Sequence, residues 1–127
     1  MNVLLMAYGT PYTPEEIAPY YTDIRRGRRP SEELLSELSE RYEAIGKSPL
    51  NEITLVQAMR LQALLNLEAP PYPKRLQGPF SPRAPHGPAR VYVGTKHWLP
   101  SIGEAVAAMH EDGVRRAVAI VAAPHYS

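Results

Sequence analysis

The sequence has 127 residues, enough for one small domain, and its 44% hydrophobic and 21% charged residues exclude wholesale disorder. A net charge of +1 excludes a general attraction to nucleic acid or anionic lipid, so anion binding would need a local cluster of basic residues. The absence of cysteine excludes disulfides, thiolate metal sites and cysteine nucleophiles, and it fits the cytoplasmic location that we expect.

The first elements are a strand and a helix. Residues 3–7 form a continuous apolar run that ends at the turn sequence YGTP, a pattern typical of a buried strand. The run is too short for a signal peptide or a membrane span, and we expect no transmembrane segment. A helix should follow, with Thr13 as N-cap, Pro14 in its first position and Glu16 closing a capping box. This helix ends near Gly27.

Two more helices are predicted before the middle of the chain. One begins at Ser31 and ends at Gly46, and it is expected to bury Leu34, Leu38, Tyr42 and Ile45. The next is predicted to begin near Thr54, which can form a capping box with Gln57, and to end around Glu68. It should bury some of Leu61, Leu64 and Leu65.

The second half begins with a loop. Residues 69–90 hold seven of the fourteen prolines and show no hydrophobic period, so we predict a long loop. It is either a mobile functional flap or a passive insertion, and we favour the insertion. Residues 90–94 read as a strand and residues 117–122 as another buried strand. The helix between them, 99–109, should bury Leu99, Ile102, Val106 and Met109 and stop at Gly113. This order predicts an α/β fold, a three-layer Rossmann-like parallel sheet with about three strands.

Polar and aromatic residues follow every predicted strand. The three sequences are YGTP, TKHW and PHYS. Because the carboxyl ends of parallel strands share one edge of a sheet, we expect these residues to line one cleft. None of His86, His97, His110 and His125 has metal-ligand spacing to another histidine, so the sequence contains no complete metal site.

The basic run RRGRR has two interpretations besides a ligand site. Arg26, Arg28 and Arg29 can be solvated surface charge, or the run can contact nucleic-acid phosphate. The near-neutral total charge and the glutamates after Pro30 argue against nucleic acid, so we predict solvated charge for these three arginines and no nucleic-acid partner.

Six sequence blocks carry a resemblance to a known family. AYGTPYTPEEI, YYTDIRRGRRP, RYEAIGKSPL, GTKHW, AVAAMHEDG and VAAPHYS occur in the order and spacing of bacterial ferrochelatases. The chain resembles most the coproporphyrin type, in which a tyrosine stands in the AYGTP block. The resemblance implies that residues 1–127 are an amino-terminal α/β domain with the chelatase-like fold, incomplete relative to the family. Only residues 69–90 depart from the pattern, because the relatives have a shorter connection there.

The resemblance also implies an activity and a set of site residues. The activity is insertion of Fe²⁺ into coproporphyrin III or protoporphyrin IX in haem biosynthesis, with iron and porphyrin as substrates and no dedicated cofactor. Tyr8 matches the tyrosine that approaches the metal of the iron porphyrin, and tyrosinate is a known haem ligand. Four residues match porphyrin-binding positions: Arg25, Arg41, Tyr42 and Ser48. His125 is a secondary catalytic candidate, near the metal-facing side of the cleft.

Three explanations of the chain length stay open. In ferrochelatases the histidine and glutamate assigned to metal delivery come from a second domain farther along the chain, and neither motif occurs here. The chain can therefore be the first part of a longer enzyme, which completes the site. It can also be a half-size chelatase that pairs with a second copy, although the small cobalt chelatases carry histidines where this chain has Tyr8. The third reading is a non-catalytic porphyrin- or anion-binding module.

Overall fold

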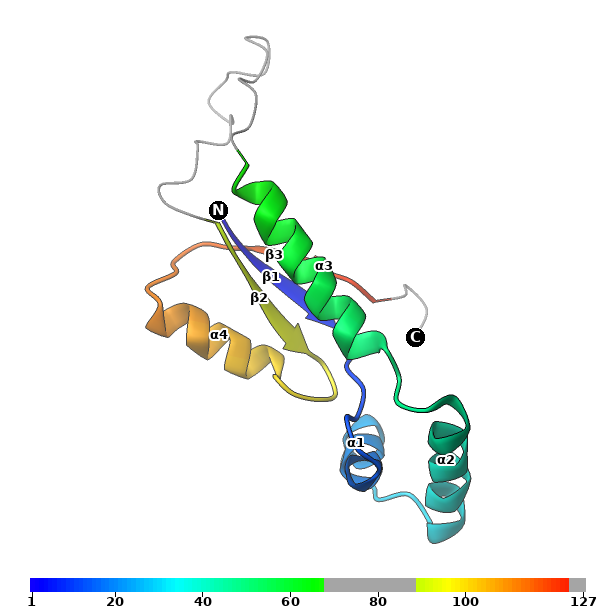
Figure 1. The fold of residues 1–127 in the computed structure, drawn as a ribbon. Coiled ribbons are helices and arrows are strands. Elements are labelled where there is room, and N and C mark those ends of the chain that lie inside the picture. Colours follow the sequence, from blue (N-terminus) through cyan, green and yellow to red (C-terminus); the bar gives the residue numbers. More distant parts are fainter. Residues whose placement is uncertain (68–88, 124–127) are drawn as a thin grey trace.

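The computed structural model describes residues 1–67 and 89–123 (Figure 1). In chain order its elements are β1 (Asn2–Ala7), the 3-10 turn η1 (Pro14–Glu16), α1 (Ile17–Ile24), α2 (Glu32–Ile45), α3 (Leu50–Leu65), β2 (Arg90–Thr95), α4 (Ile102–Glu111) and β3 (Val118–Val121). None of the helices in these two ranges combines the length and the apolar character needed to cross a membrane.

The strands form one parallel sheet in the order β2-β1-β3. The central strand β1 pairs with β2 from Asn2 opposite Arg90 to Ala7 opposite Thr95, and with β3 on its other side. Its apolar run is buried at Val3, Leu4, Leu5 and Ala7. The α/β fold and the three-stranded parallel sheet predicted from the sequence are therefore confirmed.

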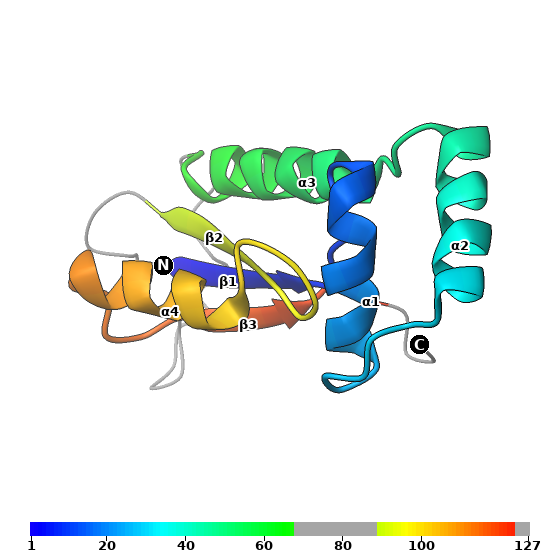
Figure 2. The ribbon, with the colours of Figure 1, turned by 90° about the horizontal axis from the view of Figure 1, so that it is seen from below.

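Helices α3 and α4 lie on opposite faces of the sheet, where both pack against β2 (Figure 2). Side chains alternate between faces along a strand, so one set of β1 residues faces each helix. Leu4 packs against Ala105 and Met109 of α4. The helices α1 and α2 lie beyond the carboxyl ends of the strands (Figures 1 and 2). This placement puts them beside the expected cleft.

The start of α3 differs from the prediction. The helix begins at Leu50, four residues before Thr54, and Pro49 stands at its N-cap position. Thr54 is buried inside the helix, where its hydroxyl donates a hydrogen bond to the Leu50 carbonyl at 2.9 Å. A threonine hydroxyl can bond either to the start of a helix or back to the preceding turn, and here it does the second.

Several predictions of burial are wrong. The large apolar residues predicted as buried but found exposed are Ile45, Leu99 and Val106. Of Leu61, Leu64 and Leu65, some of which were expected to be buried, Leu61 and Leu65 are half-buried and Leu64 is exposed. In α4, which begins after the N-cap Ser101, Ala105 and Met109 face the core and half-buried Ile102 packs against it. Val106 lies about 100° around the helix from Ala105, so it points away. All four residues of β3 are exposed, because β3 is an edge strand that no described helix covers.

The predicted loop 69–90 lies outside the described residues except for its last two, Ala89 and Arg90. Its two flanks are joined by the side chain of Asn66, which follows α3. The Asn66 amide donates to the Ala89 carbonyl at 3.0 Å and accepts from the Ala89 N–H at 2.6 Å. The end of α3 is thereby fixed to the start of β2.

Gly94 of β2 provides a test of the packing between the sheet and α4. A Cβ atom at Gly94 would lie 2.8 Å from the Ile102 Cα, a backbone atom that cannot rotate away. We expect Gly94→Ala to lower the free energy of unfolding by about 1 to 3 kcal/mol, the cost of overpacking, in urea unfolding of the complete protein.

Gly103→Ala is the matched control, since the nearest atom to its added Cβ is 3.8 Å away. Gly103 lies in the first turn of α4, where alanine favours the helix by up to about 1 kcal/mol. Equal stability losses in the two variants would contradict the close approach of α4 to β2.

Candidate functional site

The sheet topology predicts a ligand-binding crevice at the carboxyl ends of β1 and β2. The connection that leaves β1 returns through α3 on one face of the sheet, whereas the connection that leaves β2 runs through α4 on the other face. Adjacent parallel strands whose connections part in this way leave a crevice in which α/β proteins bind ligands. Tyr8 follows β1 directly, and His97 stands two residues after β2.

Backbone hydrogen bonds hold the two strand ends together. The Lys96 N–H donates to the Ala7 carbonyl at 2.9 Å, and the His97 N–H donates to the Tyr8 carbonyl at 3.1 Å. Gly9 has φ +85°, and a Cβ there would lie only 2.9 Å from the Thr95 Cβ. Only glycine fits both the left-handed backbone and this close approach. Tyr8 and His97 are therefore neighbours.

The side chains of Tyr8 and His97 also contact each other. Their ring centroids are 4.7 Å apart with an angle of 64° between the ring planes, an edge-to-face arrangement. His97 Nδ1 lies 2.8 Å from Oδ2 of Asp23, which α1 provides. The His97 side chain is only 13% exposed, whereas Asp23 is 58% exposed. Sequence reasoning placed His97 after a strand but missed its link to Asp23.

Three further tyrosines gather around this crevice. Tyr20 is buried, and its hydroxyl donates to the Gly9 carbonyl at 2.8 Å. Burial raises the pKa of Tyr20, and the nearby phenols of Tyr42, Tyr8 and Tyr21 raise it further. Burial and the hydrogen bond with Tyr42 raise the pKa of Tyr21 to about 12. A phenol of ordinary pKa is already neutral at physiological pH, and these shifts move both hydroxyl groups further from ionisation.

The predicted site residue Arg25 lies at the same end of the sheet as Tyr8. It follows α1 directly, and its N–H donates to the Tyr21 carbonyl at 3.0 Å. Tyr21, one helical turn earlier, is close enough to Tyr8 for the Tyr8 phenol to raise its pKa. The Arg25 guanidinium is exposed, and among the residues that the structure describes its one hydrogen bond goes to the Arg29 carbonyl, at 3.5 Å.

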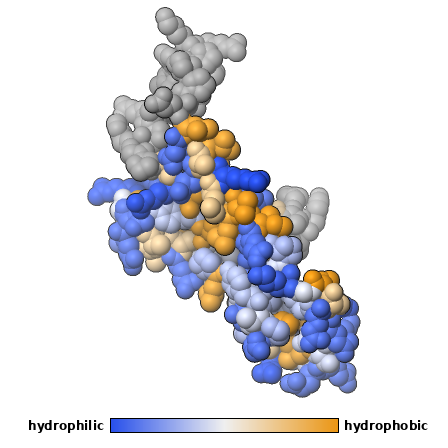
Figure 3. All heavy atoms as spheres, in the orientation of Figure 1, coloured by the Kyte–Doolittle hydropathy of each residue, from blue (hydrophilic) through white to orange (hydrophobic). Residues whose placement is uncertain are grey.

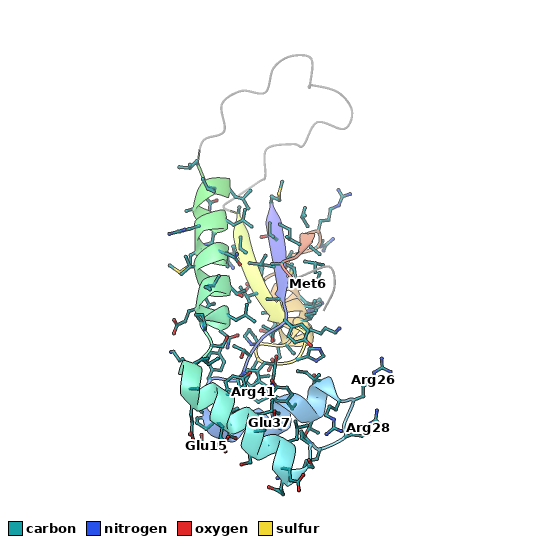
Figure 4. The ribbon with its side chains drawn as sticks, turned by 90° about the vertical axis from the view of Figure 1, so that its right-hand side faces the viewer. Met6, Glu15, Arg26, Arg28, Glu37 and Arg41 are labelled. Atoms are coloured by element: carbon teal, nitrogen blue, oxygen red, sulfur yellow. The ribbon has the colours of Figure 1, made fainter. Side chains whose placement is uncertain are left out.

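The other predicted porphyrin-binding residues lie at α2 and just after it. Tyr42 is half-buried, and its hydroxyl is 3.4 Å from the Thr10 hydroxyl in the loop after β1. Arg41 is exposed and forms an ion pair with Glu37 on the same helix (Figure 4). Ser48 is half-buried just before α3. Tyr42 thus contacts the loop that follows β1, whereas among the described residues no hydrogen bond or ion pair joins Arg41 or Ser48 to Tyr8 or His97.

Other sequence predictions have simpler outcomes. Arg26, Arg28 and Arg29 are exposed as predicted, and Arg26 and Arg28 point away from the body of the molecule (Figure 4). Arg29 lies 3.5 Å from Glu32 in a surface ion pair. The candidate His125 lies outside the described residues. Within residues 1–67 and 89–123, no group of three His, Asp or Glu side chains could hold a metal ion.

Asn51 is a site residue that sequence reasoning missed. It is buried at the start of α3, and its side chain bonds to both backbone groups of Thr10, with Nδ2 2.7 Å from the carbonyl and Oδ1 3.2 Å from the nitrogen. No local signal could identify it, because the two residues are 41 positions apart. Asn51 thereby fixes the loop that follows β1, which begins with Tyr8.

We expect Asn51→Ala to lower the free energy of unfolding by about 1 to 3 kcal/mol, because it leaves the buried backbone groups of Thr10 unpaired. Urea unfolding of the complete protein measures this change. Gln57→Ala on the same helix removes an exposed amide and should change stability by less than about 0.5 kcal/mol. Equal effects would mean that the Thr10 bonds do not hold the loop.

Comparisons with known proteins identify the family of this chain. The family model described as Ferrochelatase matches residues 1–127. The chain is 92% identical over its whole length to a ferrochelatase of Thermus thermophilus, and it covers 40% of that protein. It is 48% identical over its whole length to coproporphyrin III ferrochelatases of Bacillus subtilis and a Geobacillus species, covering 36% of each. The chain thus spans about two fifths of the length of these relatives, and it belongs to the ferrochelatase family.

Proposed function

We propose that this chain is the amino-terminal part of a cytoplasmic enzyme that inserts Fe²⁺ into a porphyrin in haem biosynthesis. The observation that carries the proposal is the position of Tyr8, half-buried in the crevice beside His97, with Tyr42 and Arg25 at the same end of the sheet. Coproporphyrin III is the preferred porphyrin, because several relatives are named for it, and protoporphyrin IX is the alternative. Iron and porphyrin are the substrates, and the reaction needs no dedicated cofactor.

The residue types suit the ligand. A porphyrin is a flat apolar ring with carboxylate side chains at its edge. Guanidinium groups bind carboxylates through paired, charge-assisted hydrogen bonds, which is the role we assign to Arg25 and Arg41. Tyr42 and Ser48 would add single hydrogen bonds from their hydroxyl groups. Arg25 is well placed for this role, since no described carboxylate pairs with it, whereas Arg41 must first leave Glu37.

Tyr8 would contact the metal. Its phenolic oxygen can act as an axial ligand of haem iron, and the crevice would direct it to one face of the macrocycle. Iron would then arrive from the other face, through residues outside the described ranges. His125 stays a secondary candidate for a catalytic residue on the metal-facing side of the cleft. The described residues of this chain would therefore bind and orient the porphyrin rather than deliver the metal.

Exposed apolar side chains on α3 and β3 indicate that further protein packs against this chain. Hydrophobic residues gather along α3 on the face seen in Figure 3, and Val56, Met59 and Leu64 of this helix are exposed. The edge strand β3 exposes Val118 and Val121. Large exposed apolar patches mark surfaces that other protein covers. We propose that the carboxyl-terminal part of a longer chain covers them, with a second copy as the alternative; the mass of the native protein distinguishes the two.

We expect Arg25→Ala in the complete enzyme to weaken binding of coproporphyrin III by about 1 to 3 kcal/mol, the range for hydrogen bonds to a charged group. A fluorescence titration with the metal-free porphyrin measures the affinity. Arg28→Ala is the matched control, because it removes an equally exposed guanidinium that points away from the body of the molecule. An unchanged affinity in Arg25→Ala would remove Arg25 from the site.

We expect Tyr8→Phe to change the absorption spectrum of bound iron coproporphyrin, because the variant lacks the oxygen that contacts the iron. Tyr12→Phe, which removes an exposed hydroxyl from the same loop, should leave the spectrum unchanged. An identical spectrum in Tyr8→Phe would make Tyr8 a structural residue. An assay of iron insertion by the unaltered enzyme distinguishes catalysis from porphyrin binding alone. If the enzyme inserts no iron, the chain is better explained as part of a non-catalytic porphyrin-binding module.

A further inference from the structure

We propose that Asp23 and His97 are positioning residues for Tyr8: Asp23 orients the His97 ring, and the His97 ring holds the Tyr8 phenol where its oxygen meets the iron. The inference rests on the proposed function for the role of Tyr8 and adds two residues to that site. It is carried by two contacts, the edge-to-face packing of Tyr8 on His97 and the 2.8 Å contact from His97 to Asp23.

The first step is that Tyr8 needs a support. It stands just after β1, half-buried, where the sheet no longer fixes its side chain. Among the described residues, His97 is the one aromatic ring that packs against it, with centroids 4.7 Å apart. This distance lies within the range in which aromatic pairs favour edge-to-face geometry. The orientation of the phenol therefore depends on that of the imidazole.

The second step is that His97 is itself held at two points. Its backbone N–H donates to the Tyr8 carbonyl, which fixes where the side chain starts. Its Nδ1 faces the Asp23 carboxylate at 2.8 Å, which fixes how the ring is turned. A carboxylate only accepts, so Nδ1 carries a hydrogen and, in the neutral ring, Nε2 does not. Asp23 thus sets both the angle and the tautomer of the imidazole.

The third step is that the hydrogen bond between His97 and Asp23 is poorly suited to a purely structural role. The Asp23 side chain is 58% exposed, and exposed pairs of this kind contribute little to stability. A buried contact on the same helix already ties α1 to the strand ends, the hydrogen bond from the Tyr20 hydroxyl to the Gly9 carbonyl. Asp23 can therefore be changed without loosening the helix, and its effect should appear at Tyr8.

The test is binding of iron coproporphyrin and of metal-free coproporphyrin III to the complete enzyme. Asp23→Ala should weaken binding of the iron porphyrin roughly 10-fold, the lower end for loss of a residue that orients a metal ligand. Its absorption spectrum should shift toward that of Tyr8→Phe. The affinity for the metal-free porphyrin should stay unchanged, because Tyr8 acts on the metal. A fall in both affinities would overturn the proposal and make Asp23 part of the porphyrin pocket.

Two variants sharpen the result. Asp23→Asn keeps an acceptor for the Nδ1 hydrogen and should restore the affinity and spectrum that Asp23→Ala loses. Glu111→Ala removes an exposed carboxylate at the end of α4, away from the crevice, and should change neither quantity. Failure of Asp23→Asn to restore the spectrum would overturn the proposal, because the role assigned to Asp23 is to accept that hydrogen bond.

Combination with Tyr8→Phe separates this inference from the proposed function. If Asp23 acts through Tyr8, Asp23→Ala should have no further effect on iron porphyrin binding in the Tyr8→Phe background. An effect of Tyr8→Phe without any effect of Asp23→Ala would overturn the positioning role and leave the proposed function intact. No effect of Tyr8→Phe would overturn the contact of Tyr8 with iron and this inference with it.

Discussion

The site depends on the parallel pairing of β1 with β2, which continues past the ends of both strands. Backbone bonds from Lys96 and His97 to Ala7 and Tyr8 extend the ladder into the loops, and the glycine after Tyr8 lets the loops touch. Because these bonds involve only the backbone, they place the two side chains side by side whatever their chemistry. The sheet thus supplies a rigid base on which the crevice is built.

Around that base the chain separates two kinds of polar group. Tyrosine hydroxyls gather inside, and burial raises the pKa of Tyr20 and Tyr21 further above the physiological range in which a phenol is neutral anyway. The exposed arginines stand outside, just after α1 and on α2, where solvent stabilises their charge. This division suits a ligand with an apolar centre and charged edges, because each part meets the environment that it requires.

The sequence predicted those features that local pattern controls. An unbroken apolar run specifies a central strand, and β1 is buried as expected, while YGTP correctly marks its end. Tyr8, Arg25 and Tyr42 could be named because six sequence blocks resemble a family, and the fold then brings them to one end of the sheet. Thr54 shows the limit of local pattern, since its hydroxyl can serve two positions in a helix.

Features that depend on distant neighbours could not be predicted. Asp23 carries no signal in its own segment, because its partner His97 is 74 residues away and belongs to another element. The prediction that β3 is buried failed for a similar reason. Its apolar sequence indicates a strand covered on both faces, yet within residues 1–67 and 89–123 all four of its residues are exposed. Apolar side chains on an edge strand favour association, so the sequence of β3 is better explained by protein that packs onto it than by this domain alone.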